Sequence, residues 1–148
     1  MGVRRRAREA ALKALYSIEY EIAGSSEEDR ARGLDLLWTH VLELNDETRG
    51  FSVGLVDGVL SNIDEINELI TQTSKRWKLE RMAVIDRNIL RMASYEITKR
   101  EDIPVKVSIN EAIEIAKRFG SSESAAFVNG ILDRIAEVTG NLRTSLEP

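Results

Sequence analysis

The chain has 148 residues, with 21 basic and 25 acidic side chains and a formal net charge of -4 at pH 7. This length suits a single domain with a substantial core, and we expect one domain over residues 1–148. Cysteine is absent and histidine occurs once, which excludes disulfides, thiolate metal sites, cysteine nucleophiles and multi-histidine metal centres. We therefore expect no metal and no other cofactor. No unbroken apolar run follows the basic start, as a signal sequence would require, and this favours the cytoplasm without a membrane partner.

Basic side chains are concentrated at the start of the chain. Residues 1–15 contain one acidic side chain, Glu9, and five basic ones: Arg4, Arg5, Arg6, Arg8 and Lys13. Such an asymmetry in an acidic chain indicates an interaction surface rather than a need of folding. On a helix, Arg5 and Arg8 share a side with Tyr16, which gives cations for phosphates and a ring for base stacking. The alternative is a solvated N-terminus without a specific partner.

Apolar residues recur at spacings of three and four through almost the whole chain, which predicts about seven helices and no strand. The first helix is expected to end at Gly24, the second to carry Trp38, and the third to follow Asn45. The remaining helices are expected to begin near residue 62, to cover 84–98, to end at 119 before Gly120, and to run over about 122–139 before Gly140.

Two pairs of residues have the spacing of a capping box, in which two side chains satisfy free amides at a helix start. Asn62 pairs in this way with Glu65, and Ser108 pairs with Glu111. Each pair therefore predicts the first turn of a helix.

Glycines give two signals that need interpretation. The pair Asn129-Gly130 is typical of a hairpin turn, but the apolar residues around it keep helical spacing and favour a helix. Gly50, Gly54 and Gly58 form a GxxxGxxxG series, which is typical of close helix packing. Charged residues in the same segment favour packing between helices of a globular protein over dimerisation in a membrane.

No group of residues predicts catalysis. A glycine-rich phosphate loop after a strand is absent, and Asp64, Glu65 and Glu68 resemble a solvated helix face. His40 lies near Trp38 and has no evident partner, so a surface or packing role is favoured over catalysis. We therefore predict a binding protein, not an enzyme.

Four separated segments carry a family resemblance: "RRRAREAALKALY" at 4–16, "VIDRNILRMASYEI" at 84–97, "IPVKVSINEAIEIAKRFG" at 103–120 and "FVNGILDRI" at 127–135. Together they resemble the NusB transcription antitermination family. The resemblance implies an all-α fold of two small helical bundles sharing a core. It also implies binding of boxA-type single-stranded RNA together with ribosomal protein NusE, which supports processive transcription of ribosomal RNA operons by the elongation complex.

The resemblance further implies which residues bind each partner. The RNA surface carries over onto Arg4, Arg5, Arg6, Arg8, Tyr16, Glu123 and Phe127, and the NusE surface onto Glu80 and Asp86. A core role for Phe127 is an equal alternative, since it lies at the edge of an apolar stripe. Ala126 departs from the many family members that have lysine at this position, so one phosphate contact is expected to be missing.

Two other functions stay open at this level. The same helical domain occurs fused to RNA methyltransferases, but the chain has no βαβ pattern or cofactor-binding glycine loop. In the other alternative, the chain is a homodimeric interaction module in which a second subunit covers the arginines.

Overall fold

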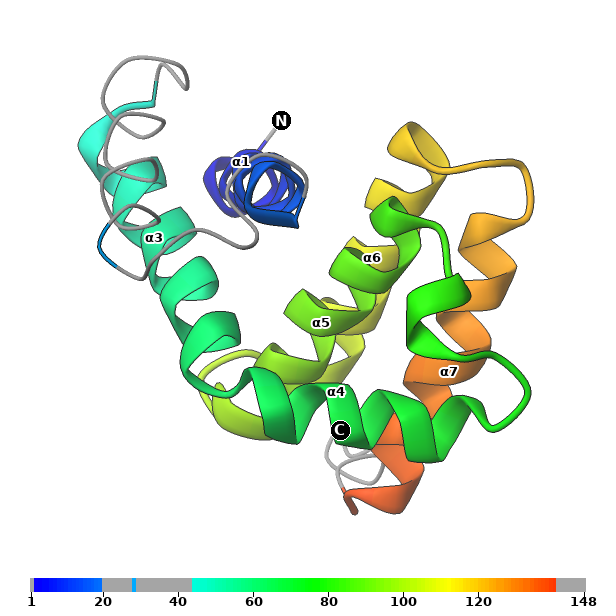
Figure 1. Cartoon of the computed structure of the whole chain (residues 1–148). Coiled ribbons are helices and arrows are strands. Elements are labelled where there is room, and N and C mark those ends of the chain that lie inside the picture. Colours follow the sequence, from blue (N-terminus) through cyan, green and yellow to red (C-terminus); the bar gives the residue numbers. More distant parts are fainter. Residues whose placement is uncertain (1, 20–27, 29–43, 141–148) are drawn as a thin grey trace. The chain divides into compact units, whose positions relative to one another are not determined.

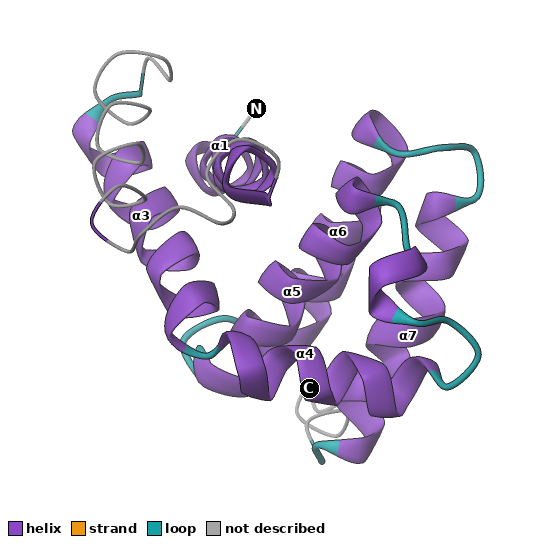
Figure 2. Cartoon of the chain, in the orientation of Figure 1, coloured by secondary structure: helices purple, strands orange, loops and turns teal. Residues whose placement is uncertain are grey.

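The computed structural model describes residues 2–19, 28 and 44–140. Within these residues it contains six α-helices and one short 3-10 helix, and no strand (Figures 1 and 2). The all-helical prediction is therefore confirmed. The predicted helix that carries Trp38 and His40, and the predicted helix end at Gly24, lie outside the described residues.

The chain divides into two compact units, residues 1–57 and 58–148. The expectation of one domain stays a prediction. The first unit contains α1 (Val3–Ser17) and most of α3 (Asp46–Ser61). The Oγ atom of Ser52 on α3 donates a buried hydrogen bond of 2.9 Å to the carbonyl oxygen of Ala7 on α1. This bond joins the two helices beside a row of buried alanines and leucines on α1: Ala7, Ala10, Ala11, Leu12, Ala14 and Leu15.

The second unit contains the end of α3 and all later elements: α4 (Ile63–Ser74), the 3-10 helix η3 (Leu79–Arg81), α5 (Val84–Lys99), α6 (Val105–Phe119) and α7 (Ser124–Val138). Helix α6 packs against both α5 and α7, and α4 packs across the same two helices (Figure 1). The core consists of fully buried aliphatic side chains from these four helices: Ile66, Ile70, Ile89, Leu90, Ile115, Val128, Leu132 and Ile135. Their burial is the main stabilising contribution to this bundle.

The later helices agree with the sequence prediction. Helix α5 covers the expected region, α6 ends before Gly120, and α7 continues through Asn129-Gly130 without a turn. Gly140 follows α7 with a positive φ of 76°, a conformation that glycine adopts without a steric cost. None of the helices within the described ranges is both long enough and apolar enough to cross a bilayer.

The helix start predicted at Asn62 is confirmed, although its side chain does not form the capping-box hydrogen bond, and the helix start predicted at Ser108 is wrong. Asn62 does occupy the N-cap of α4, but its side-chain nitrogen donates to the carbonyl oxygen of Gly58, in the preceding turn, at 2.8 Å. Helix α6 begins at Val105, so Ser108 lies inside it and donates a buried hydrogen bond of 2.7 Å to Glu96 on α5. The spacing of residues in the sequence does not show these hydrogen bonds, because Asn62 and Ser108 bond to groups outside the predicted helix starts.

The predicted close packing at the glycine series is confirmed at one of its three positions. A Cβ atom on Gly58 would collide with the ring of Tyr95 from α5, whereas no atom of the described residues lies within 4 Å of such a Cβ on Gly50 or Gly54. The missing side chain of Gly58 therefore leaves room for the Tyr95 ring.

Candidate functional site

The arginine-rich start of the chain forms the first turns of α1. Arg4 and Arg6 are exposed, Arg5 is partly exposed, and Arg8 is buried with 3% of its surface accessible. No acidic residue occupies the first turn. Cations at a helix N-terminus oppose the helix dipole, so these arginines do not stabilise the helix that carries them. Their placement is better explained by an anionic ligand.

Phe51 on α3 lies under two of these arginines. The guanidinium carbon of Arg4 is 4.7 Å from the centre of its ring, and that of Arg8 is 5.3 Å away. Both distances are within the range of cation–π attraction. The sequence does not reveal this contact, because nothing in the spacing relates residue 51 to residues 4 and 8.

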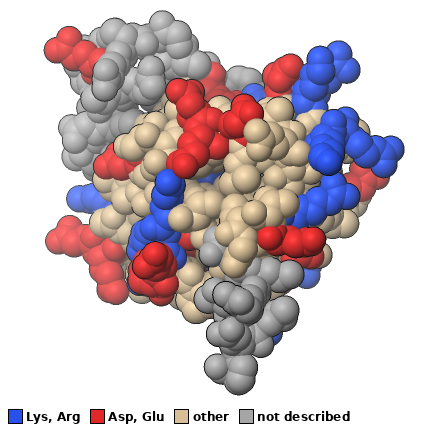
Figure 3. All heavy atoms as spheres, turned by 90° about the horizontal axis from the view of Figure 1, so that it is seen from below, with Lys and Arg blue, Asp and Glu red and all other residues tan. Residues whose placement is uncertain are grey.

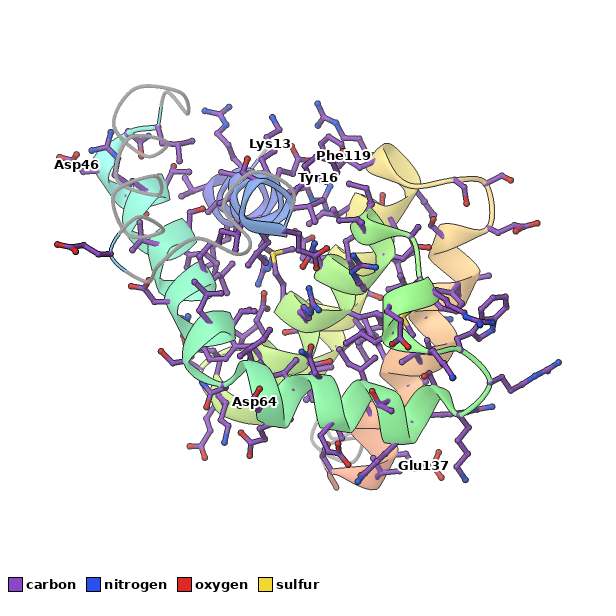
Figure 4. The ribbon with its side chains drawn as sticks, viewed as in Figure 1. Lys13, Tyr16, Asp46, Asp64, Phe119 and Glu137 are labelled. Atoms are coloured by element: carbon purple, nitrogen blue, oxygen red, sulfur yellow. The ribbon has the colours of Figure 1, made fainter. Side chains whose placement is uncertain are left out.

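Tyr16 extends the arginine-rich surface along α1. Its side chain is 43% exposed, and the neighbouring Lys13 is exposed as well. Both side chains project from α1 in Figure 4. An exposed ring on a basic helix suits base stacking, which stays the prediction for Tyr16.

The other predicted site residues belong to the second unit, where several of them border one pocket. This pocket has a volume of about 170 Å³ and is lined by Trp77, Arg81, Met82, Ala83, Asp86, Ser121, Glu123 and Phe127. Its lining includes Asp86, which was predicted to bind the protein partner, as well as Glu123 and Phe127, which were predicted to bind RNA. Glu80 is exposed on η3 and does not line the pocket.

Two aromatic rings meet at this pocket. Trp77 and Phe127 pack edge to face, with ring centres 5.9 Å apart and planes at 89°. Trp77 is 54% exposed, and Phe127 is partly exposed. Phe127 therefore belongs fully to neither the core nor the surface. Sequence analysis missed Trp77, although an aromatic content of only 5% is a reason to ask what each ring does.

The turn before α7 positions Glu123 and Phe127. The backbone amide of Ser121 donates to Ser124 Oγ at 2.9 Å, and the amide of Glu123 donates to Ser121 Oγ at 3.3 Å. These bonds hold the turn in a non-helical form, so α7 begins at Ser124 rather than near residue 122 as predicted. Glu123 becomes the N-cap residue and is exposed beside the pocket.

Asp86 has the least ordinary environment of the predicted site residues. It lies in the first turn of α5, is only 9% exposed, and lines the pocket. Within the described residues, its Oδ1 atom has no hydrogen-bond partner. Buried polar atoms in folded proteins almost always have a partner, so this carboxylate is a candidate for binding a ligand.

No metal centre is evident in the part of the chain that the structure describes, since no three ligating side chains come together there. Charges of both signs surround uncharged surface on the face shown in Figure 3. Neither sign covers that face alone, so it offers no extended electrostatic surface for a polyanion.

Comparison with known proteins identifies the family. The model of the NusB family matches residues 5–137. A transcription antitermination protein NusB from Myxococcus xanthus is 48% identical over 139 residues, which cover 92% of this chain and 96% of the relative. The solved structure of T. maritima NusB is 39% identical, with a TM-score of 0.77 and 90% of each chain covered. These relatives are antitermination proteins, not enzymes, in agreement with the sequence prediction.

A further solved structure contains the antitermination factors NusB and NusE in complex with double-stranded RNA. It is 21% identical to this chain, has a TM-score of 0.74, and covers 92% of this chain and 97% of its own. This likeness concerns the fold. From the family match and the two closer similarities above, we conclude that the chain belongs to the NusB family.

Proposed function

We propose that this protein is a transcription antitermination factor that binds boxA-type single-stranded RNA together with ribosomal protein NusE. In this role it joins the elongation complex and supports processive transcription of ribosomal RNA operons. The observation that carries the proposal is the arginine-rich first turn of α1, in a chain of the NusB family. Because bacterial transcription takes place in the cytoplasm, the same role implies a cytoplasmic location.

The first part of the RNA site is the arginine-rich surface of α1. Arg4, Arg5 and Arg6 reach solvent and contact phosphates, while the buried Arg8 adds positive charge and supports the surface through Phe51. Tyr16 provides a ring for stacking on the same helix.

A separate RNA-binding surface, in the second unit, is the start of α7. Phe127 offers the exposed portion of its ring to a base, and Glu123 accepts hydrogen bonds from base or ribose donors. Ala126 is exposed next to Phe127 and supplies no charge there, so this part of the site contacts bases more than phosphates.

The protein partner is NusE, held through Glu80 and Asp86. A structural relative occurs in a complex with NusE and RNA, which supports the same pairing here. Glu80 is exposed on η3 and is free to meet a basic side chain at the rim of an interface, where it mainly increases the association rate. Asp86 is buried and requires a group that enters the pocket.

The test is a titration of labelled RNA with the full-length protein, followed by fluorescence anisotropy. Because the related complex contains double-stranded RNA, the titration includes a boxA single strand, a scrambled strand of equal composition and a duplex of the same length. We expect the boxA strand to bind most tightly. Equal affinity for all three, or tighter binding of the duplex, would reject recognition of single-stranded boxA. Light scattering of the free protein tests the alternative of a homodimer that masks the arginines.

A further inference from the structure

The pocket beside Phe127 contains a carboxylate that the fold buries and leaves with an unpaired oxygen. We propose that this pocket binds the guanidinium group of an arginine side chain from the protein partner, with Asp86 as its ligand. The proposal rests on the partnership with a basic protein proposed above and specifies its chemistry.

The state of Asp86 indicates a cationic ligand. Asp86 has 9% of its surface exposed, and its buried Oδ1 atom has no hydrogen-bond partner among the described residues, so this oxygen has lost its water without gaining a protein donor. Burial of an unpaired carboxylate is unfavourable, and a bound cation with several N–H donors removes that penalty. In the free protein, the Oδ1 atom of Asp86 therefore lacks a hydrogen-bond donor among the described residues.

The other charges around the pocket favour the same type of ligand. Glu123 adds a second carboxylate, and Arg81, which is exposed, contributes the one cation of the lining. The lining is therefore net negative, which disfavours a phosphate group inside the pocket and limits RNA to the exposed parts of Phe127 and Glu123 at its rim. An approaching cation is attracted to it, with Asp86 as the innermost acceptor.

The aromatic residues favour arginine over lysine. Trp77 packs edge to face with Phe127 and is 54% exposed, so its indole ring is accessible beside the pocket. A planar guanidinium stacks on such a face while its N–H groups form paired hydrogen bonds with a carboxylate, and a lysine ammonium cannot do both. Binding of one anchor side chain in a small pocket is also typical of protein interfaces.

A nucleobase is the rival ligand, since it also stacks on aromatic rings. A base is neutral, however, and gains less from a net-negative pocket than a cation does, and its attached phosphate would be repelled. The experiment therefore compares the two ligands directly.

The probes are N-acetyl-arginine amide, the uncharged isostere N-acetyl-citrulline amide, and guanosine monophosphate. Trp77 is one of two tryptophans, so a Trp38→Phe variant of the full chain reports on it alone through fluorescence. The methyl NMR signal of Met82, which also lines the pocket, gives a second readout in the wild-type protein. We expect the arginine probe to change both signals with saturation, at an affinity roughly tenfold or more above that of the citrulline probe.

Matched variants then locate the binding site. Asp86→Asn preserves size and removes charge, and we expect it to weaken binding of the arginine probe by roughly tenfold or more. Asp133→Asn changes an exposed aspartate of α7 outside the pocket and should have no effect. Circular dichroism and urea unfolding establish that both variants are folded. Glu123→Gln, at the exposed rim, provides a second pocket variant if Asp86→Asn does not fold.

Several results would overturn the assignment: no saturable response to arginine, equal binding of citrulline, tighter binding of the nucleotide, or no effect of the pocket variants. Binding of NusE to the wild-type protein is measured in parallel. If NusE binds but the arginine probe does not, only the pocket assignment fails. If the arginine probe binds but NusE does not, the pocket stands and the proposed partnership fails.

Discussion

The guanidinium carbon of Arg4 lies 4.7 Å from the centre of the Phe51 ring, so an aromatic face from α3 supports the start of α1. Each such contact contributes about 0.5–1 kcal/mol at an exposed site. We expect Phe51→Leu, which retains apolar volume but lacks the ring, to weaken RNA binding by about 1 kcal/mol because the arginines lose their support. Phe51→Tyr should bind as the wild type does. Anisotropy titrations of the three proteins measure this difference.

Urea unfolding of the Phe51 variants is the necessary control, since a misfolded Leu variant would lose affinity for another reason. A Leu variant that is as stable as the wild type and binds RNA with unchanged affinity would show that the ring has no positioning role.

Substitutions of the α1 arginines should have different effects, depending on how buried each side chain is. Arg6 is exposed, so Arg6→Ala should lower the slope of log affinity against log salt by about 0.7, the value for one phosphate contact on a single strand. Arg8 is buried, so Arg8→Ala should act mainly by lowering the free energy of unfolding, since the contacts of its alkyl chain are lost. Titrations at four salt concentrations, with the exposed Lys106→Ala as control, provide the slopes. Equal slopes for Arg6→Ala and the wild type would argue against a phosphate contact.

Phe127 and Leu132 lie on the same helix and should respond differently to truncation. Leu132 is fully buried, and Leu132→Ala should cost about 2–5 kcal/mol of stability without a specific effect on RNA binding. Phe127 is partly exposed, so Phe127→Ala should cost less stability than the ~3–5 kcal/mol of a buried phenylalanine, and about 1–3 kcal/mol of RNA binding. Urea unfolding and RNA titration of both variants decide this. A severely destabilised Phe127→Ala that still binds RNA normally would identify Phe127 as a core residue.

Two glycines one turn apart on α3 should give opposite results. Gly54 is exposed and has no described atom within 4 Å of its Cβ position, so Gly54→Ala should stabilise the protein by about 0.5–1 kcal/mol through helix propensity. Gly58→Ala should destabilise it, because the new methyl group would collide with the Tyr95 ring. Thermal unfolding of the two variants measures the difference. If Gly58→Ala were as stable as Gly54→Ala, the tight packing of the Tyr95 ring against Gly58 would be contradicted.

Helical periodicity was sufficient to predict most of the described fold. The stripe over 84–98 predicted α5, and the unbroken spacing across Gly130 predicted a helix where a local motif suggested a turn. Helix starts were less predictable because they depend on the partner that a polar side chain finds in space. Ser108 shows this: it has capping-box spacing but bonds to Glu96 from another helix.

The individual residues of the candidate site could be predicted from the sequence, but their arrangement in space could not. The resemblance pointed to Asp86 and Phe127 separately and assigned them to different partners, whereas the structure places both around one pocket. Phe51 and Trp77 were not predicted, because their contacts with Arg4 and Phe127 join residues about 50 positions apart. Such contacts have no periodic signature in a single sequence.

The central claim is that this protein binds boxA-type RNA and NusE together, and one measurement tests it most directly. Labelled boxA single strand is titrated with the full-length protein in the absence and presence of saturating NusE. We predict specific binding by the protein alone and a higher affinity when NusE is present. No binding of boxA RNA under either condition, or an affinity for boxA that equals that for a scrambled strand with NusE present, would contradict the claim.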